Sequence, residues 1–276
     1  MANKSIGVFD SGFGGLTVLK SLTEVLPEYD FIYLGDNARA PYGNRSFESV
    51  YEFTLQCVKK LFELDCDLVV LACNTASAKA LRNIQQNYLP TLKENKKVLG
   101  VIRPTTEIAG KLSRNGHLGI LGTQGTVKSE SYIVELEKFF PQLKVSQQAC
   151  PMWVPLVENN EHLTVGADYF VKSELDNLLK QDAQIDTILL GCTHYPLLVP
   201  IIEKHLSKNI KLVSQGPIVA QSLKDYLSRH PEIDSNCTKS GEVTFYTTDD
   251  TTSFDEKASM FFGKKIKSSH TNVASF

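Results

Sequence analysis

Short apolar segments without polar alternation recur along this chain of 276 residues and alternate with longer amphipathic segments. Such apolar runs are typical of parallel strands buried on both faces, because the helices that connect parallel strands cover both sides of the sheet. The pattern therefore predicts an α/β fold with mainly parallel sheets. The predicted strands lie at 5–9, 31–35, 67–72, 97–101, 117–122, 187–191, 210–213 and 243–248.

Between these strands, apolar residues recur at helical spacing. The predicted helices include 46–64, 126–140, 167–181 and 251–262. Ser46 precedes the first of them and is predicted to be its N-cap. The apolar stripe of that helix consists of Val50, Phe53, Thr54, Cys57, Leu61 and Leu64. The final segment, 264–276, loses periodicity and is predicted to be frayed.

A weak internal repeat relates residues 6–22 to residues 118–133. Each copy reads as a strand, a small polar turn and a helix, and downstream of each copy another strand ends in a cysteine. These cysteines are Cys73 and Cys192. Ligands of parallel α/β sheets bind beyond the carboxyl ends of the strands. The repeat therefore predicts two pseudo-symmetric α/β domains that face a cleft, with one thiol on each wall.

Composition excludes several classes of function. With 29 basic and 31 acidic side chains, the formal net charge of −2 gives no basic footprint for nucleic acid or anionic membrane. The N-terminus lacks the apolar core of a signal peptide, and no segment approaches the ~18 apolar residues of a membrane span. We therefore expect a soluble, cytoplasmic protein that binds neither nucleic acid nor membrane.

The six cysteines are scattered and form no C-x-x-C pair, which favours free thiols over disulfides in a chain of this size. Most of them are expected to be small buried residues. That expectation covers Cys57, Cys66, Cys150 and Cys237. A metal site that uses Cys192 and His194 with His162 or Glu158 is the alternative role, but no usual zinc spacing is present.

Cys73 and Cys192 are different, because small polar residues follow each of them directly. Two thiols on opposite walls of a cleft can invert a carbon centre, since one removes a proton as thiolate while the other delivers one as thiol. Asp10 and His194 are the expected modulators of the two thiols, one on each side.

Several stretches together resemble the cofactor-independent aspartate/glutamate racemase superfamily, and within it the bacterial glutamate racemases. They are spread over most of the chain in the family's order. The matching stretches are 9–18, 35–46, 72–78, 150–158 and 191–198. The resemblance implies two domains, of which the first is discontinuous. We place the first domain at 1–97 plus 208–276 and the inserted domain at 98–207.

The resemblance also implies the site. Cys73 and Cys192 match the family's acid/base cysteines. The supporting catalytic residues are Asp10, His194 and Glu158. In the direction from L- to D-glutamate, Cys192 with His194 and Glu158 removes the α-proton and Cys73 reprotonates the opposite face, and Asp10 supports Cys73 in reverse. The segments that match the substrate-binding positions are Asp10–Ser11, Tyr42–Gly43, Asn74–Thr75 and Thr193–His194.

The implied activity is interconversion of L- and D-glutamate for peptidoglycan synthesis. No cofactor and no metal are implied, the partner is a small-molecule substrate, and a homodimer is compatible with the resemblance. Alternatives are a racemase of aspartate or another amino acid on the same fold, or a non-catalytic protein that binds a ligand or a partner.

The glycine turn at 10–15 is not interpreted as a nucleotide-binding loop, because the full G-x-G-x-x-G is missing.

One departure from the family pattern is visible. Ser214 and Gln215 stand where an Asp–Ser pair is expected before Gly216. Because this position lies outside the matched motifs, the departure is expected to affect only the packing of a local turn.

Overall fold

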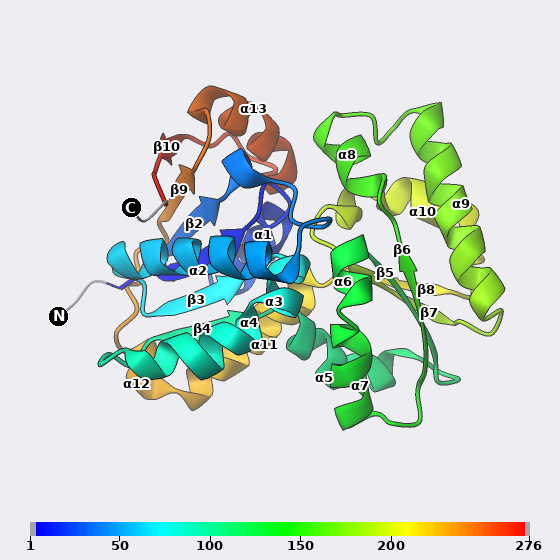
Figure 1. Cartoon of the computed structure of the whole chain (residues 1–276), viewed down its shortest axis with the longest axis horizontal. Coiled ribbons are helices and arrows are strands. Elements are labelled where there is room, and N and C mark those ends of the chain that lie inside the picture. The colour runs from blue at the N-terminus through cyan, green and yellow to red at the C-terminus, as the bar shows by residue number, and fades with distance from the viewer. Residues whose placement is uncertain (1–3, 274–276) are drawn as a thin grey trace.

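The computed structural model describes residues 4–273, which form two α/β bodies side by side (Figure 1). Each body has a parallel sheet with helices on both faces. Three strands are buried at every position, as expected where helices cover both faces of a sheet: β1 (Ile6–Asp10), β3 (Leu68–Leu71) and β7 (Thr187–Gly191). The predicted α/β class with mainly parallel sheets is confirmed.

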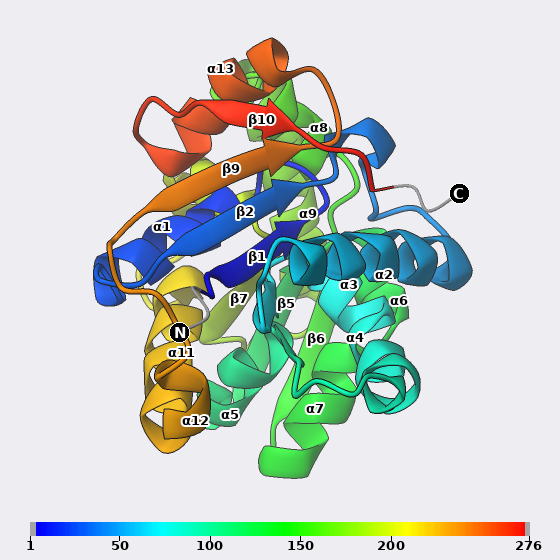
Figure 2. The same ribbon diagram turned by 90° about the vertical axis from the view of Figure 1, so that its left-hand side faces the viewer.

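The first sheet takes strands from both ends of the chain, in the order β10-β9-β2-β1-β3-β4, and each pair of neighbouring strands is parallel. Figure 2 shows β10, β9, β2 and β1 stacked in that order. The bounds are β1 Ile6–Asp10, β2 Phe31–Gly35, β3 Leu68–Leu71, β4 Lys97–Gly100, β9 Val243–Thr247 and β10 Ser268–His270.

The second sheet has the order β6-β5-β7-β8 and is also parallel. Its strands are β5 His117–Gly122, β6 Lys144–Ala149, β7 Thr187–Gly191 and β8 Lys211–Val213. This order repeats the part β2-β1-β3-β4 of the first sheet. The internal repeat is therefore structural: β1 and β5 are equivalent, and so are β3 and β7, the two strands that end in cysteine.

Two strands were not predicted. Both β6 and β10 are edge strands, and their sequences carry polar residues instead of an apolar run. The prediction of a frayed tail is wrong for residues 268–270, because β10 pairs in parallel with β9. The last part of that prediction, residues 274–276, lies outside the described residues.

Strand pairing also corrects the domain boundaries. The boundaries at 98 and 207 rested on 97–101 and 210–213 as flanking strands. However, β4 pairs with β3 and so belongs to the first sheet, whereas β8 pairs with β7 and belongs to the second. The chain therefore crosses between the domains directly after β4 and directly after β8, a few residues later than predicted at both points.

The helices of the first body lie between and after its strands. They are α1 Leu16–Val25, η1 Asn37–Arg39, α2 Phe47–Glu63, α3 Asn74–Lys79, α4 Leu81–Asn83, η2 Ile84–Tyr88, η3 Leu89–Thr91, α11 Gly216–Arg229, α12 Pro231–Asp234 and α13 Thr251–Phe262. The hydroxyl of Ser46 accepts a hydrogen bond from the amide of Ser49 at 3.1 Å, which confirms the predicted N-cap of α2.

The second body holds α5 Ile102–Leu112, α6 Gln124–Lys128, α7 Ser131–Phe139, α8 Trp153–Glu158, α9 Val165–Gln181, η4 Tyr195–Leu198 and α10 Val199–His205. The single helix predicted at 126–140 is instead two helices. Glu130 lies between them with a left-handed φ of 54°, which interrupts the helical backbone. Within residues 4–273, no helix has both the length and the apolar character needed to cross a membrane.

Candidate active site

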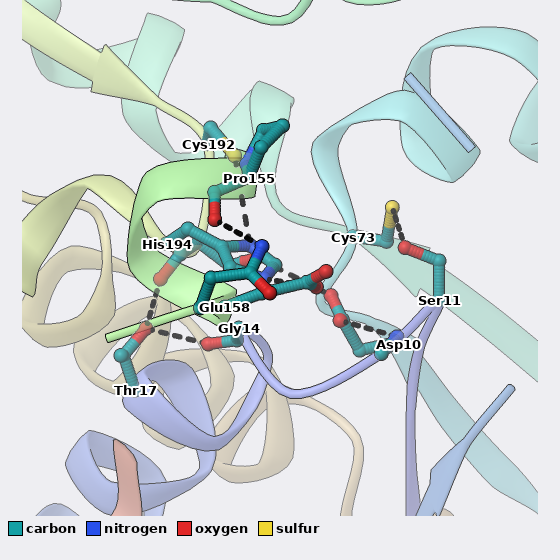
Figure 3. Close-up of polar contacts among 12 residues, drawn as sticks. Asp10, Ser11, Gly14, Thr17, Cys73, Pro155, Glu158, Cys192 and His194 are labelled. Carbon is teal, nitrogen blue, oxygen red and sulfur yellow. Dashed lines mark hydrogen bonds and ion pairs between the residues drawn. The ribbon is translucent and has the colours of Figure 1, made fainter. Parts of the chain in front are cut away.

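The polar ends of three buried strands meet between the two bodies. β1 leads into the turn that starts at Asp10, β3 leads to Cys73, and β7 leads to Cys192. Helix α8 adds Glu158 at its last position. Because all strands in each sheet are parallel, their carboxyl ends lie at one edge, and the two edges face each other here (Figure 3).

On the second-domain side, Cys192, His194 and Glu158 form a connected series. His194 Nδ1 lies 3.9 Å from Cys192 Sγ, and His194 Nε2 lies 2.9 Å from Glu158 Oε1. Burial alone would lower the pKa of His194, but its hydrogen bonds to Cys192 and Glu158 outweigh burial and raise the pKa to about 10. His194 is therefore an imidazolium at neutral pH and places a positive charge beside the sulfur of Cys192 and the carboxyl group of Glu158.

On the first-domain side, Cys73 is the N-cap of α3. Its Sγ accepts a hydrogen bond from the amide of Ala76 at 3.5 Å and lies 3.4 Å from the hydroxyl of Ser11. Burial raises the pKa of Cys73 to about 12, and the negative charge of Asp10 adds to the rise. Cys73 is therefore a neutral thiol at neutral pH and carries a proton that it can donate.

Asp10 connects the two sides. Its carboxylate accepts hydrogen bonds from the amide of Gly12 at 2.9 Å and from the hydroxyl of Thr193 at 3.4 Å. Burial raises the pKa of Asp10, although His194 and the nearby amides oppose that rise. The sequence led us to expect that Asp10 modulates one thiol and His194 the other. In the structure, the hydroxyl beside the Cys73 thiol belongs to Ser11, and Asp10 raises the pKa of this thiol through its negative charge.

The turn after β1 packs directly on the turn after β7. The hydroxyl of Thr17 donates a hydrogen bond to the carbonyl of Thr193 at 2.9 Å. At Gly14 an added Cβ would lie 2.3 Å from the Thr193 hydroxyl and 2.4 Å from His194 Nδ1, closer than real Cβ contacts. Glycine is therefore required at position 14, because the backbone approaches His194 too closely for a side chain.

Tyr42 and Gly43 lie in the loop that follows η1. The hydroxyl of Tyr42 donates a hydrogen bond to the buried carboxylate of Asp36, which also binds Arg39 at 2.7 Å. The Tyr42 side chain thus attaches the loop to Asp36 of the first domain, whereas the backbone at Gly43 contacts the second domain. There, the carbonyl of Gly43 accepts a hydrogen bond from the amide of Gly125 at 2.7 Å.

Sequence reasoning missed two threonines of the second domain. The Thr75 hydroxyl lies 2.9 Å from that of Thr123 and 3.5 Å from that of Thr126. The internal repeat contained a signal for them, because the turn at 123–126 is the second-domain counterpart of the turn that begins at Asp10. Three hydroxyls from two domains therefore gather beside the Cys73 turn.

Gln215 was expected to affect only a local turn, and that expectation is wrong. Its side-chain oxygen accepts a hydrogen bond from Asn74 Nδ2 at 2.7 Å, so it contacts the residue that follows Cys73.

The alternative of a metal site finds no support in the geometry. Within residues 4–273, no group of three or more His, Cys, Asp or Glu side chains is placed to hold a metal ion. Both ring nitrogens of His194 already face Cys192 and Glu158. The Nδ1 atom of His162 is buried without a hydrogen-bond partner, so it is bonded to none of these side chains.

Access to the site is narrow. Cys73 and Cys192 are each 6% exposed, and the side chain of Glu158 is 21% exposed. A cavity of about 710 Å³ between the domains is lined by parts of α3, α5, α7 and α11, and by none of the predicted site residues. We call this arrangement closed, because both thiols are almost fully covered and Gly43 and Gly125 are hydrogen-bonded across the two domains.

A cysteine at the carboxyl edge of each of two repeated parallel sheets defines a class of α/β proteins suited to proton transfer on both faces of a small acid. The Asp/Glu/Hydantoin racemase family matches residues 6–223, and the chain belongs to this family.

Several relatives that this chain resembles are glutamate racemases. The enzyme of Roseobacter denitrificans is 38% identical over 273 residues, covering 95% of this chain and 98% of the relative. A solved glutamate racemase isoform of Bacillus anthracis has a TM-score of 0.89 and 35% identity, covering 99% of this chain and 98% of that one. Glutamate racemase from Francisella tularensis, solved in complex with D-glutamate, has a TM-score of 0.88 and 30% identity, with 100% of both chains covered.

Proposed function

We propose that this protein is a glutamate racemase that interconverts L- and D-glutamate by a two-base mechanism without a cofactor. The observation that carries the proposal is the placement of Cys73 and Cys192 at the ends of equivalent strands in two facing domains, each with its own polar partners. Full-length relatives named glutamate racemase support glutamate as the substrate.

In the direction from L- to D-glutamate, Cys192 acts as the base. Its thiolate takes the α-proton, and the electron pair of the broken C–H bond stays on the substrate. Cys73 then donates its thiol proton to the opposite face of the α-carbon, so that Cys192 ends as thiol and Cys73 as thiolate. The imidazolium of His194 beside Cys192 and the neutral thiol of Cys73 are the protonation states that this direction requires.

The reverse direction needs a thiolate at Cys73. The Ser11 hydroxyl and the Ala76 amide are hydrogen-bond donors that favour the thiolate, whereas burial and Asp10 oppose it. Asp10 supports this direction if it receives the Cys73 proton, and its raised pKa suits that role.

The substrate is held by hydroxyls and backbone amides instead of a paired cation. The hydroxyls of Ser11, Thr75 and Thr193 lie at the ends of β1, β3 and β7 and can donate to carboxylate oxygens. Tyr42–Gly43, Asn74 and His194 complete the proposed set. Because these groups come from both domains, substrate binding favours the closed arrangement.

The proposed biological role is to supply D-glutamate for peptidoglycan, in the cytoplasm. The protein is proposed to act on a small molecule only, without nucleic acid or membrane as partner. A homodimer is the assembly to test, by light scattering of the purified protein at several concentrations.

The proposed function is tested by polarimetry on L-glutamate and L-aspartate without added cofactor. We expect turnover of glutamate to exceed that of aspartate at least tenfold, because the shorter acid leaves a void and misplaces its second carboxylate. Comparable rates would assign the protein to a broader amino-acid racemase. No turnover of either acid, together with tight ligand binding, would support a non-catalytic binding protein.

A further inference from the structure

Gln215 lies at the point where the chain returns from the second domain to the first. It follows β8 of the second sheet and precedes α11 of the first body. Gln215 is 4% exposed, and the two hydrogens of its amide nitrogen are shared among three acceptors: the Tyr132 hydroxyl at 2.7 Å, the Thr105 hydroxyl at 3.0 Å and the Val101 carbonyl at 3.2 Å. A buried amide with this many partners is a structural junction, because its own nitrogen and oxygen would otherwise be left unpaired away from water.

The side chains of Gln215, Tyr132 and Asn74 form a closed ring of hydrogen bonds. Asn74 Nδ2 donates to Gln215 Oε1, Gln215 Nε2 donates to the Tyr132 hydroxyl, and that hydroxyl donates to Asn74 Oδ1, each at 2.7 Å. Burial raises the pKa of Tyr132, so its hydroxyl remains a donor. The Val101 carbonyl can only accept, so the Gln215 atom that faces it is Nε2. This sets the direction of the ring and, with it, the orientation of the Asn74 amide.

The ring joins the two domains at the Cys73 turn. Asn74 is the first residue of α3 and directly follows Cys73, whereas Tyr132 lies on α7 and Thr105 on α5 of the second domain. Cys73 caps the same helix that Asn74 begins. Any rotation of the second domain that pulls Tyr132 or Gln215 away releases the Asn74 amide.

We propose that Gln215 is a positioning residue for racemisation, because it holds the Asn74 amide, and with it the Cys73 turn, in the orientation that the closed site uses. Gln215 acts through Asn74, which is itself proposed to bind the substrate. This inference rests on the proposed function. It adds that affinity for glutamate depends on a side chain outside the cleft, at the crossover between the domains.

The test compares Gln215→Met and Tyr132→Phe with wild type. Methionine keeps the length and bulk of glutamine without its hydrogen bonds, and phenylalanine removes only the hydroxyl from the ring. Gln221→Met is the matched control, because Gln221 is an exposed residue of α11 whose side chain donates a hydrogen bond to Asp225 on the same helix. Each variant is measured for KM, kcat and hydrogen–deuterium exchange of the peptide spanning residues 73–79.

We expect both ring variants to raise KM for glutamate about tenfold while kcat changes less, since a misoriented binding group weakens binding of the substrate first. The double variant is expected to be no worse than the more severe single variant, because either change alone opens the ring. Exchange at residues 73–79 is expected to become faster in both ring variants and to stay unchanged in Gln221→Met.

A KM within twofold of wild type in both single variants overturns the inference, as does an equal effect of Gln221→Met. If Gln215→Met fails to fold, Tyr132→Phe still decides the matter, because it deletes a single oxygen. A wild-type protein that does not racemise glutamate refutes the proposed function instead. The exchange measurement would then still test whether Gln215 and Tyr132 order the Cys73 turn.

Discussion

Replacing Gly14 by alanine is expected to disable the site without touching either cysteine. The added Cβ would lie 2.4 Å from His194 Nδ1 and 2.3 Å from the hydroxyl of Thr193, whereas ordinary contacts begin near 3.4 Å. Something must therefore move by about 1 Å. His194 is the group that moves least freely, because it is buried, bonded to Glu158 at 2.9 Å and packed edge-on against Phe261.

The size of the effect follows from that displacement. A misplacement of about 1 Å at a reacting group can cost roughly 10²-fold in rate, which corresponds to about 2.7 kcal/mol. Overpacking of a buried contact costs a further ~1–3 kcal/mol of folding stability. We therefore expect Gly14→Ala to lose about 10²-fold in kcat/KM and to melt several degrees below wild type.

Gly12→Ala is the matched control in the same turn. Its added Cβ would meet Glu158 Oε1 at 3.5 Å and the side chains of Ala40 and Asn37 at 3.9 Å, which are ordinary contacts. We expect this variant to keep kcat/KM within about threefold of wild type. The assay is polarimetry on L-glutamate at several concentrations, with thermal unfolding followed by circular dichroism.

Two results would refute the reasoning. If Gly14→Ala racemises glutamate as fast as wild type, His194 is not held against this backbone during turnover. If Gly12→Ala loses as much activity as Gly14→Ala, the turn is sensitive to any side chain and the distance to His194 is not the cause.

Four further predictions concern the chemistry and the stability of the site. Cys73→Ser and Cys192→Ser should each cut racemisation severely, because a serine hydroxyl is a far weaker base at neutral pH, whereas Cys237→Ser at the half-exposed cysteine should change turnover little. In deuterated water, early D-glutamate should carry deuterium at the α-carbon while the remaining L-glutamate does not, and retention of the original α-hydrogen would exclude two bases. Activity should be unchanged after dialysis against a chelator, with no visible absorbance of a bound group; rescue only by a metal or by pyridoxal phosphate would contradict the mechanism. The raised pKa of His194 means that its imidazolium stabilises the fold fully below pH ~6.5 and that this contribution is lost as the pH rises to about 10. The stability advantage of wild type over His194→Gln in urea should therefore shrink across that interval, and a constant difference would show that His194 is not held protonated.

The elements that could be predicted from the sequence are those whose own residues carry the burial pattern. Strands β1, β3, β5 and β7 read as apolar runs because helices cover both faces of the central strands in each sheet. The N-cap Ser46 and both strand-end cysteines are likewise local features. The repeat also indicated the equivalence of the two domains, since strand, turn and helix recur in the same order.

Edge strands could not be predicted in this way. β6 and β10 each have a neighbouring strand on one side only, so neither needs a continuous apolar run. The domain boundaries were misplaced for a related reason. An apolar strand at a boundary fits either sheet, and only its hydrogen-bonded neighbour decides which, as β4 and β8 demonstrate.

The residues of the candidate site show the same difference between what the sequence determines and what the tertiary structure determines. The sequence by itself determined which residue types stand at the strand ends: two thiols, a histidine and carboxylates. Only the tertiary structure decided that Ser11 and not Asp10 lies beside Cys73, and that Gln215 orders Asn74 across the domain junction. These pairings join residues 62 and 141 positions apart in the chain. The Ser11–Cys73 contact follows from the pairing of β1 with β3 within the first sheet, and the Asn74–Gln215 contact follows from how the two domains are placed against each other. Neither leaves a periodic signal in the sequence.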